Sequence, residues 1–231
     1  MRLIHFSPIF LSVSMVASTI WAQDLKDIPP PTPPLVAPVP ENADWVVTLL
    51  RPKAAPKTDG SPAATAPADR RIIEVRSTKT GRYKRDRIST ADGVTEERWF
   101  VDMLLLWPTA TGEVAVTDLS GIPFTAEDSN PSVPQGFPGV AWLRPEYFDK
   151  VVLFEKRPSY HYVHGDTEAW IDVETRLPLA YKISNAAFQF KFNPPPAGPL
   201  TLPAAYQKSL AICEKAAAYR KKLLKDLSGG R

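Results

Sequence analysis

Cysteine is almost absent from this chain of 231 residues, which contains only Cys213. No disulfide can form within the chain, so an oxidising compartment would be tolerated but not used to stabilise the fold. No cysteine stands at the cleavage region after the apolar N-terminal segment, so a lipid anchor of the bacterial lipoprotein type is not expected. The one Asn-x-Ser/Thr triplet, Asn130-Pro131-Ser132, is blocked by its proline.

Recognisable catalytic motifs are also lacking. The chain has no nucleophile elbow, HExxH, Cys-x-x-Cys, phosphate loop or glycine-rich dinucleotide fingerprint. Its formal net charge of +3 indicates no particular partner and does not favour nucleic acid. We therefore expect a non-enzymatic protein with no cofactor, no bound metal and no nucleic-acid partner.

The N-terminus has the pattern of a secretory signal peptide. Arg2 supplies a positive charge, an apolar run extends over residues 3–20, and Ala22 offers a small residue for cleavage. The alternative is a retained anchor helix, but Pro8 and the serines weaken a bilayer span. We expect cleavage after residues 1–22, no membrane span thereafter, and a periplasmic or secreted bacterial protein.

Two segments are rich in proline. Residues 23–43 contain DIPPPTPPLVAPVP, which predicts an extended linker because proline lacks an amide donor and restricts φ. Residues 52–69 are rich in alanine and proline and predict a flexible loop inserted after the first strand. The remaining residues from 44 to 228 form one predicted domain, followed by a tail at 229–231.

The domain reads mainly as antiparallel strands. Alternating apolar residues predict strands at 45–49, 83–90 and 94–101, with Asp92-Gly93 as a tight turn whose two residues both have positive φ. The apolar run 103–107 predicts a strand buried on both faces, although a helix has the same pattern. Further strands follow Phe148, with turns expected at Arg157-Pro158, 164–166 and 173–176.

Two longer segments complete the predicted domain. Residues 123–148 form a long connection whose aromatic residues should pack on the sheet. Residues 203–227 predict a C-terminal helix that begins at Pro203 and packs through Tyr206, Leu210, Cys213, Ala217 and Leu224. We expect a curved antiparallel sheet or incomplete β-barrel, closed on one side by this connection and this helix.

The stretch EAWIDVETRLPLAYKI (168–183) raises the question of catalysis. Asp172 is either an acid/base residue or a turn residue that accepts amide hydrogens from Glu174 or Thr175; the turn role is the commoner one. Leu177, Leu179, Tyr181 and Ile183 share one face of a half-buried strand, in which Pro178 indicates an edge position or the start of pairing.

Two polar groups could bind ligands. HYVHGDTE offers His161, His164, Asp166 and Glu168 to a metal, but residues three apart in a strand face opposite ways, so hairpin residues are the preferred reading. The basic stretch 70–87 offers Arg76, Arg82, Arg85 and Arg87 to phosphates or lipid headgroups. Arg85 and Arg87 share a face with Tyr83, whereas Lys84 and Asp86 take the other. The alternative is a solvated outer face that protects sheet edges.

The leader, the strand meander, AWIDVETRLPLAYKI and the following FQFKF resemble the periplasmic lipoprotein-carrier (LolA/LolB-like) superfamily. The resemblance implies a curved sheet around an apolar groove that takes acyl chains or a protein partner, without catalysis. We predict that the chain binds a lipid, a lipoprotein acyl chain or another apolar ligand as a carrier or sensor. The predicted groove residues are Trp99, Leu105, Trp107, Phe137, Trp142, Phe154, Trp170, Phe188 and Phe190. The alternative is a cell-envelope structural or interaction module that uses its basic surface and Pro-rich spacer to contact an envelope protein.

Overall fold

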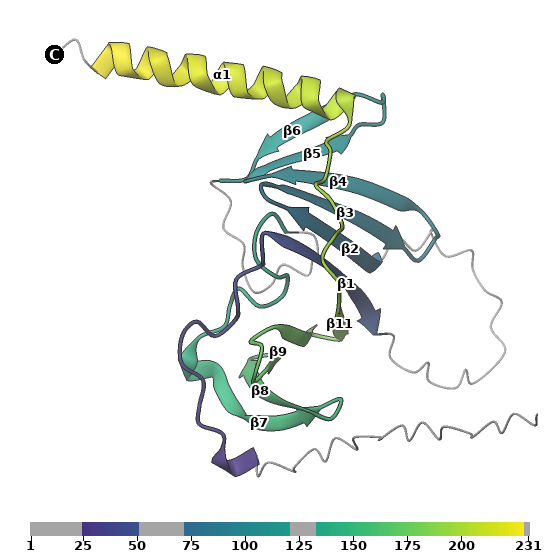
Figure 1. Cartoon of the computed structure of the whole chain (residues 1–231), viewed down its shortest axis with the longest axis vertical. Coiled ribbons are helices and arrows are strands. Elements are labelled where there is room, and N and C mark those ends of the chain that lie inside the picture. The colour runs from purple at the N-terminus through teal and green to yellow at the C-terminus, as the bar shows by residue number, and fades with distance from the viewer. Residues whose placement is uncertain (1–24, 51–71, 121–132, 229–231) are drawn as a thin grey trace, which may run out of the picture.

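The structure, a computed structural model, describes residues 25–50, 72–120 and 133–228 (Figure 1). The predicted signal peptide, the inserted loop at 52–69 and the tail at 229–231 lie outside these residues. The described part is one antiparallel sheet of eleven strands with a C-terminal helix packed against it, which confirms the predicted fold class.

The strands and helices have the following bounds. The strands are β1 (Asn42–Leu50), β2 (Ile72–Thr80), β3 (Tyr83–Thr90), β4 (Thr95–Val101), β5 (Leu104–Pro108), β6 (Val114–Asp118), β7 (Phe148–Phe154), β8 (Arg157–His164), β9 (Thr167–Asp172), β10 (Pro178–Ile183) and β11 (Ala186–Asn193). The helices are the short η1 (Leu25–Asp27) and η2 (Pro145–Tyr147) and the long α1 (Ala204–Ser228).

The sheet consists of two meanders joined at the first strand. Its order is β6-β5-β4-β3-β2-β1-β11-β10-β9-β8-β7, so consecutive strands form hairpins on each side of β1. The sheet is open, with β6 and β7 at opposite edges. The chain must therefore cross from one edge of the sheet to the other between residues 118 and 148, and Figure 1 shows the described part of this connection beside the lower half of the sheet.

The sheet curves, so its two faces differ. We call inner the face that carries Trp45 and outer the face that carries its chain neighbour Asp44, because successive strand residues point to opposite faces. Trp45 and Phe190 on the central strands meet Tyr160 and Tyr162 of β8 in one buried cluster. Side chains from strands so far apart in the sheet can meet only where the face is concave.

The crossing connection fills much of this concave face. Phe137, Val140, Trp142 and Leu143 are buried in the inner cluster, as the aromatic content of the segment predicts. The Phe137 ring meets the Trp45 ring edge-on at a centroid distance of 5.5 Å. The concave face is thus a packed core over most of its extent.

The Pro-rich stretch behaves differently from the predicted linker. Its prolines keep it free of strand pairing, but Ile28 is buried in the inner cluster and Leu35, Val36 and Val39 pack against it. The Ala37 amide donates to the carbonyl of Arg176 at 2.9 Å. The described part of this stretch belongs to the folded domain because its apolar residues, interspersed with the prolines, find a complementary surface.

The helix α1 begins one residue after Pro203 but lies against the outer face, not on the side covered by the crossing connection. Leu210 is buried with Trp99, Val101 and Leu106 of β4 and β5, and Tyr206 packs beside them. The prediction that connection and helix close the same side is wrong. Ala217 and Leu224 are also exposed, because α1 extends past the sheet (Figure 1).

Among the described residues, no helix combines the length and apolar character needed to cross a membrane.

The turns confirm some predictions and correct others. Asp172 Oδ1 accepts hydrogen bonds from the amides of Glu174 (3.0 Å) and Thr175 (2.8 Å), so the aspartate fixes this turn. The β7–β8 turn is formed by Glu155 and Lys156, both at positive φ, and not by Arg157-Pro158, which begin β8.

The predicted Asp92-Gly93 turn is present, but only its glycine has positive φ. Asp92 instead accepts hydrogen bonds through Oδ1 from the Thr90 hydroxyl (2.5 Å) and the Val94 amide (3.3 Å). The side chain of the aspartate organises this loop, which therefore differs from a two-residue hairpin turn.

Two strands differ in burial from their predicted pattern. In β5 only Leu106 is fully buried, because β5 lies next to the edge strand β6 and not deep in the sheet. In β10 residues 178–181 are buried on both faces, and the strand lies between β9 and β11. Pro178 starts the pairing, beside an irregularity in the register, and does not mark an edge.

A close approach between the connection and the sheet generates the first prediction. Gly139 has a φ of 69°, and an added Cβ would overlap the Tyr181 ring. Gly139→Ala should lower the free energy of unfolding by about 1–3 kcal/mol through overpacking, in addition to the backbone strain. Chemical denaturation measures this.

Gly136→Ala is the matched control, because Gly136 has a similar φ of 76° but open space around its Cβ position. It should show only the backbone cost, about 1 kcal/mol. Equal losses in the two variants would contradict the packing of the connection on Tyr181.

Candidate functional site

The inner face has a pocket beside its packed core. It has a volume of about 400 Å³, within the range of roughly 300–1,000 Å³ that small-molecule sites occupy. Strands β1 to β4, the Pro-rich stretch and the start of the crossing connection surround it. Its lining residues are Pro38, Val39, Trp45, Lys79, Gly81, Arg82, Lys84, Phe100, Asp102, Pro134, Gln135 and Gly136.

The floor of the pocket is a row of cross-strand neighbours. Lys79 of β2 pairs with Ala43 on one side and with Lys84 of β3 on the other, and Lys84 pairs with Phe100 of β4. Paired residues point to the same face, so the two lysines face the pocket side by side. Like charges in directly opposed positions are destabilising, and an anion near them would offset that cost.

The Lys84 side chain is buried in this floor, with 3% of its side chain exposed. Its Nζ donates to Asp86 Oδ2 at 2.7 Å and to the Val133 carbonyl at 2.6 Å. The ammonium also lies 4.7 Å from the centroid of the Phe100 ring and 5.6 Å from that of Trp45, as in a cation–π contact.

These contacts decide what the Lys84 amine can do. Burial lowers the pKa of Lys84, and attraction and hydrogen bonding to the Asp86 carboxylate partly offset that effect. The hydrogen bond to the Val133 carbonyl also ties β3 to the crossing connection. The amine is thus held as a fixed group in the pocket floor.

Trp45 contributes the second notable group. Its side chain is fully buried, and among the described residues its indole Nε1–H has no hydrogen-bond partner. A buried donor without a partner costs free energy. Trp45 also lines the pocket.

Arg82 adds a cation at the pocket. Its guanidinium contacts Asp102 at 2.9 Å and Glu214 of α1 at 3.4 Å. The arginine side chain is 46% exposed, so these ion pairs are solvent-screened and weak. The pocket therefore combines apolar walls with cationic groups from Lys79, Arg82 and Lys84.

The nine predicted groove residues do not form one lining, and none of them lines this pocket. Four are buried in the inner cluster: Phe137, Trp142, Phe188 and Phe190. Trp99 lies in the outer cluster beside α1. Whether any of them binds a ligand remains a prediction.

The other four are partly buried at two further places. Leu105 and Trp107 of β5 line a separate surface hollow near the beginning of β4. Phe154 and Trp170 lie against each other at a centroid distance of 5.5 Å, and the Trp170 ring also stacks on His161 on the outer face.

The four predicted anion-binding arginines also separate. Only Arg82 lines the pocket. On the outer face Arg76 contacts Asp44, Arg87 contacts Glu97, and the Arg85 guanidinium lies over the Trp99 ring. As predicted, Arg85 and Arg87 share one face while Lys84 and Asp86 share the other. The strands β2 and β3 are interior, so these arginines do not protect a sheet edge.

Sequence reasoning missed Trp45, Lys79, Lys84 and Phe100 as site residues. One signal was available. Lys84, Asp86 and Ile88 are two residues apart in β3 and share one face, and this pattern indicates an ion pair beside an apolar residue. The pairing of Lys79 with Lys84 depends on the β2–β3 register, which the turn at Gly81 sets.

The alternation of β8 separates His161 and His164, which the sequence offered as possible metal ligands. The ring of His164 lies 4.1 Å from that of Tyr147, whereas His161 lies on the opposite face. The His161 Nδ1 and Nε2 atoms each lie 3.1 Å from a carboxylate oxygen, of Asp149 and Glu168 respectively. Hydrogen bonds from Lys182 and His161 lower the pKa of Glu168. Among the described residues no group of three or more His, Cys, Asp or Glu side chains is arranged to hold a metal.

The buried pair predicts a specific stability pattern. Lys84→Met should lower the free energy of unfolding by about 3–5 kcal/mol, because it leaves the Asp86 carboxylate without its buried counter-ion. The double variant Lys84→Met with Asp86→Leu should recover most of that loss. Urea denaturation of both variants measures the effect. If the single variant is as stable as the original chain, the pair does not support the pocket floor.

Comparison of the chain with protein-family models, with curated proteins and with solved structures finds no match.

Proposed function

We propose that this chain is an exported, non-enzymatic protein that binds an amphiphilic ligand, with an apolar body and an anionic end, in the inner pocket. The observation that carries the proposal is the pocket floor, where Lys79 and Lys84 are cross-strand neighbours and Lys84 lies beside the rings of Trp45 and Phe100. Lipids with a single acyl chain and an acidic or phosphate-bearing head match this chemistry.

The apolar walls support the first half of the proposal. Trp45 and Phe100 present aromatic rings, and Pro38, Val39 and Pro134 contribute aliphatic surface. Removing an acyl chain from water against such walls is favourable by about 25 cal/mol per Å² of buried apolar area. A pocket of about 400 Å³ suits one slender apolar group and not a large lipid.

The charges support the second half. Lys79 donates to the Pro40 carbonyl at 3.3 Å, and Lys84 and Arg82 have carboxylate partners. Three cationic side chains nonetheless converge on a single pocket, and an anionic end of a ligand would reduce their mutual repulsion.

Export supports a role in handling such molecules outside the cytoplasm, as a carrier or a sensor. It rests on Arg2, the apolar run at 3–20 and Ala22, which have the signal-peptide pattern. The predicted resemblance to lipoprotein carriers also implies a ligand with an acyl chain. The pocket supports the proposal independently of that resemblance.

The alternative of an envelope interaction module has less support. It depends on a free Pro-rich spacer and an unpaired basic surface. The described part of the stretch packs on the domain core, and Arg76 and Arg87 contact carboxylates on the outer face.

A binding experiment tests the proposal. Isothermal titration calorimetry should show that laurate binds the purified chain more tightly than uncharged dodecanol, which has an alkyl chain of the same length. In the variant Lys79→Gln with Arg82→Gln, the preference for laurate should fall by about tenfold or more, because the loss of even one charge-assisted hydrogen bond of about 1.5 kcal/mol corresponds to roughly tenfold in affinity.

The control removes two positive charges from the outer face, through Arg87→Gln with Arg157→Gln. Both side chains are more than half exposed, so this variant should keep the preference for laurate. An equal loss of the preference for laurate in both variants would show that the preference depends on the net charge of the protein and not on the pocket. Absence of laurate binding to a folded sample, together with no lipid detected by mass spectrometry after organic extraction, would overturn the proposal.

A further inference from the structure

We propose that the part of α1 that follows Cys213 binds the surface of an anionic phospholipid membrane. This inference concerns a different face of the molecule from the inner pocket and does not depend on the function proposed for that pocket. It rests on the exposure of the helix, on its apolar stripe and on its charge.

The first observation is that, in the described structure, more than half of α1 is exposed. Tyr206 and Leu210 anchor its first turns on the outer face, and Arg82 contacts Glu214. Every residue from Glu214 to Leu227 is exposed. At about 1.5 Å per residue this segment extends roughly 20 Å past its last anchor, as Figure 1 shows.

The second observation is an apolar stripe that begins at Ile212 and continues along this exposed segment. Ile212, Ala216, Tyr219, Leu223 and Leu227 follow one another at intervals of four and three residues, which places them along one side of a helix. Leu224 adjoins the stripe. The five large side chains among these six residues are between 44% and 77% exposed. Apolar side chains in such a row indicate a surface that becomes covered.

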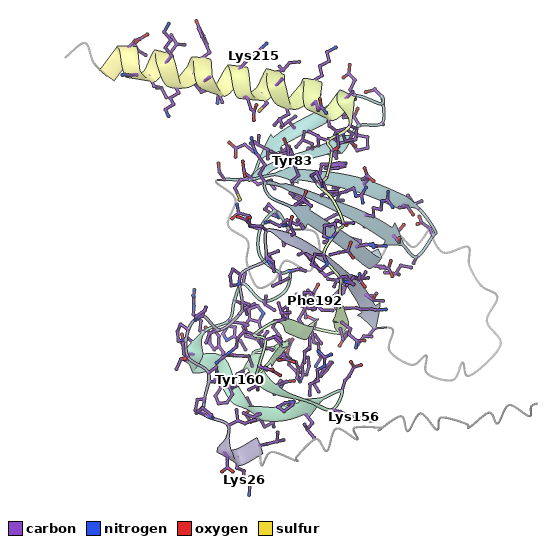
Figure 2. All side chains as sticks on the ribbon, viewed as in Figure 1. Lys26, Tyr83, Lys156, Tyr160, Phe192 and Lys215 are labelled. Carbon is purple, nitrogen blue, oxygen red and sulfur yellow. The ribbon has the colours of Figure 1, made fainter. Side chains whose placement is uncertain are left out.

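The third observation is charge. The helix contains six basic and two acidic residues, for a net charge of +4, which exceeds the +3 of the whole chain. Lys215 and Lys222 flank the stripe on one side and Arg220 flanks it on the other. Figure 2 shows Lys215 projecting from the free part of α1, well away from the sheet.

The combination selects among the candidate partners. A helix with basic flanks and an apolar side that carries leucine and tyrosine lies in a membrane interface, with its apolar side among the acyl chains and its lysines near anionic headgroups. A second copy of the helix would bring the same basic flanks together. A nucleic acid would match the lysines but would leave the leucines in water.

Vesicle co-sedimentation of the purified full chain tests the inference. The chain should bind vesicles of phosphatidylcholine mixed with phosphatidylglycerol and should not bind vesicles of phosphatidylcholine alone. Added salt should weaken binding, because screening reduces the attraction between lysines and headgroups. Any other segment that contacts lipid is common to all the variants below, so differences among them report on α1.

Two paired variants separate the contributions of charge and apolar surface. Lys215→Gln with Lys222→Gln should lower the partition coefficient about tenfold or more, at roughly 1 kcal/mol for each lysine near the surface. Leu223→Gln with Leu227→Gln should lower it at least about tenfold through lost apolar burial. Glutamine is a good helix former and these sites are exposed, so circular dichroism and the melting temperature should remain unchanged.

The matched controls make the same changes on β1, β7 and β11 and in the β7–β8 turn, which lie away from α1. Lys156→Gln with Lys191→Gln and Leu50→Gln with Leu153→Gln involve exposed residues away from α1, and both variants should bind vesicles as the original chain does. Figure 2 shows Lys156 at the opposite end of the molecule from Lys215.

Three results would overturn the inference. One is equal binding to neutral and anionic vesicles, and another is unchanged binding of both α1 variants. The third is a dimer of the original chain, seen by light scattering, that becomes a monomer in the leucine variant while vesicle binding stays the same. That last result would assign the stripe to a second copy of the chain.

Discussion

The ladder between the first strand and the last strand holds the two halves of this sheet together. β1 and β11 pair over seven residues, and each of the other strands belongs to a meander on one side of this ladder. The buried Asp44 carboxylate reinforces the junction, because it accepts hydrogen bonds from Thr78 (2.9 Å) and Asn193 (2.6 Å) on the two neighbouring strands. Arg76 lies 3.3 Å from the same carboxylate.

This arrangement has a consequence for the inner face. Because the meanders end at opposite edges, the chain crosses the sheet between β6 and β7, and its aromatic residues enter the concave core. The sheet is therefore not an empty half-barrel. What remains is a smaller pocket at the start of the connection, whose floor is formed by β2, β3 and β4 and whose buried Lys84 contacts the Val133 carbonyl.

The two proposed binding surfaces use similar chemistry in different settings. In the pocket, cations lie beside aromatic rings in a confined and partly desolvated space, which suits one small amphiphile. On α1, lysines flank exposed leucines along an open helix, which suits an extended interface. Arg82 lies between them, since it lines the pocket and contacts Glu214 at the base of the free helix segment.

The sequence alone determined the features that depend on neighbours along the chain. Strand alternation, the Asp172 turn, the C-terminal helix and the separation of Arg85 from Lys84 follow from residues a few positions apart, where periodicity and hydrogen bonding are local. Such patterns did not predict that β10 is buried on both faces or that the Pro-rich stretch packs on the core. Burial on a second face depends on which distant segment covers it.

Only the tertiary structure decided which apolar residues surround a ligand-sized space. Trp45 and Phe137 meet because the crossing connection folds back onto the sheet, and Asp44 and Asn193, 149 positions apart, meet because β1 pairs with β11. Apolar residues at every second position indicate that a strand's side chains alternate between the two faces of the sheet. This pattern does not indicate which face is concave or which segment fills it. Curvature and long-range pairing place Lys84 in the floor of a pocket and leave the end of α1 exposed.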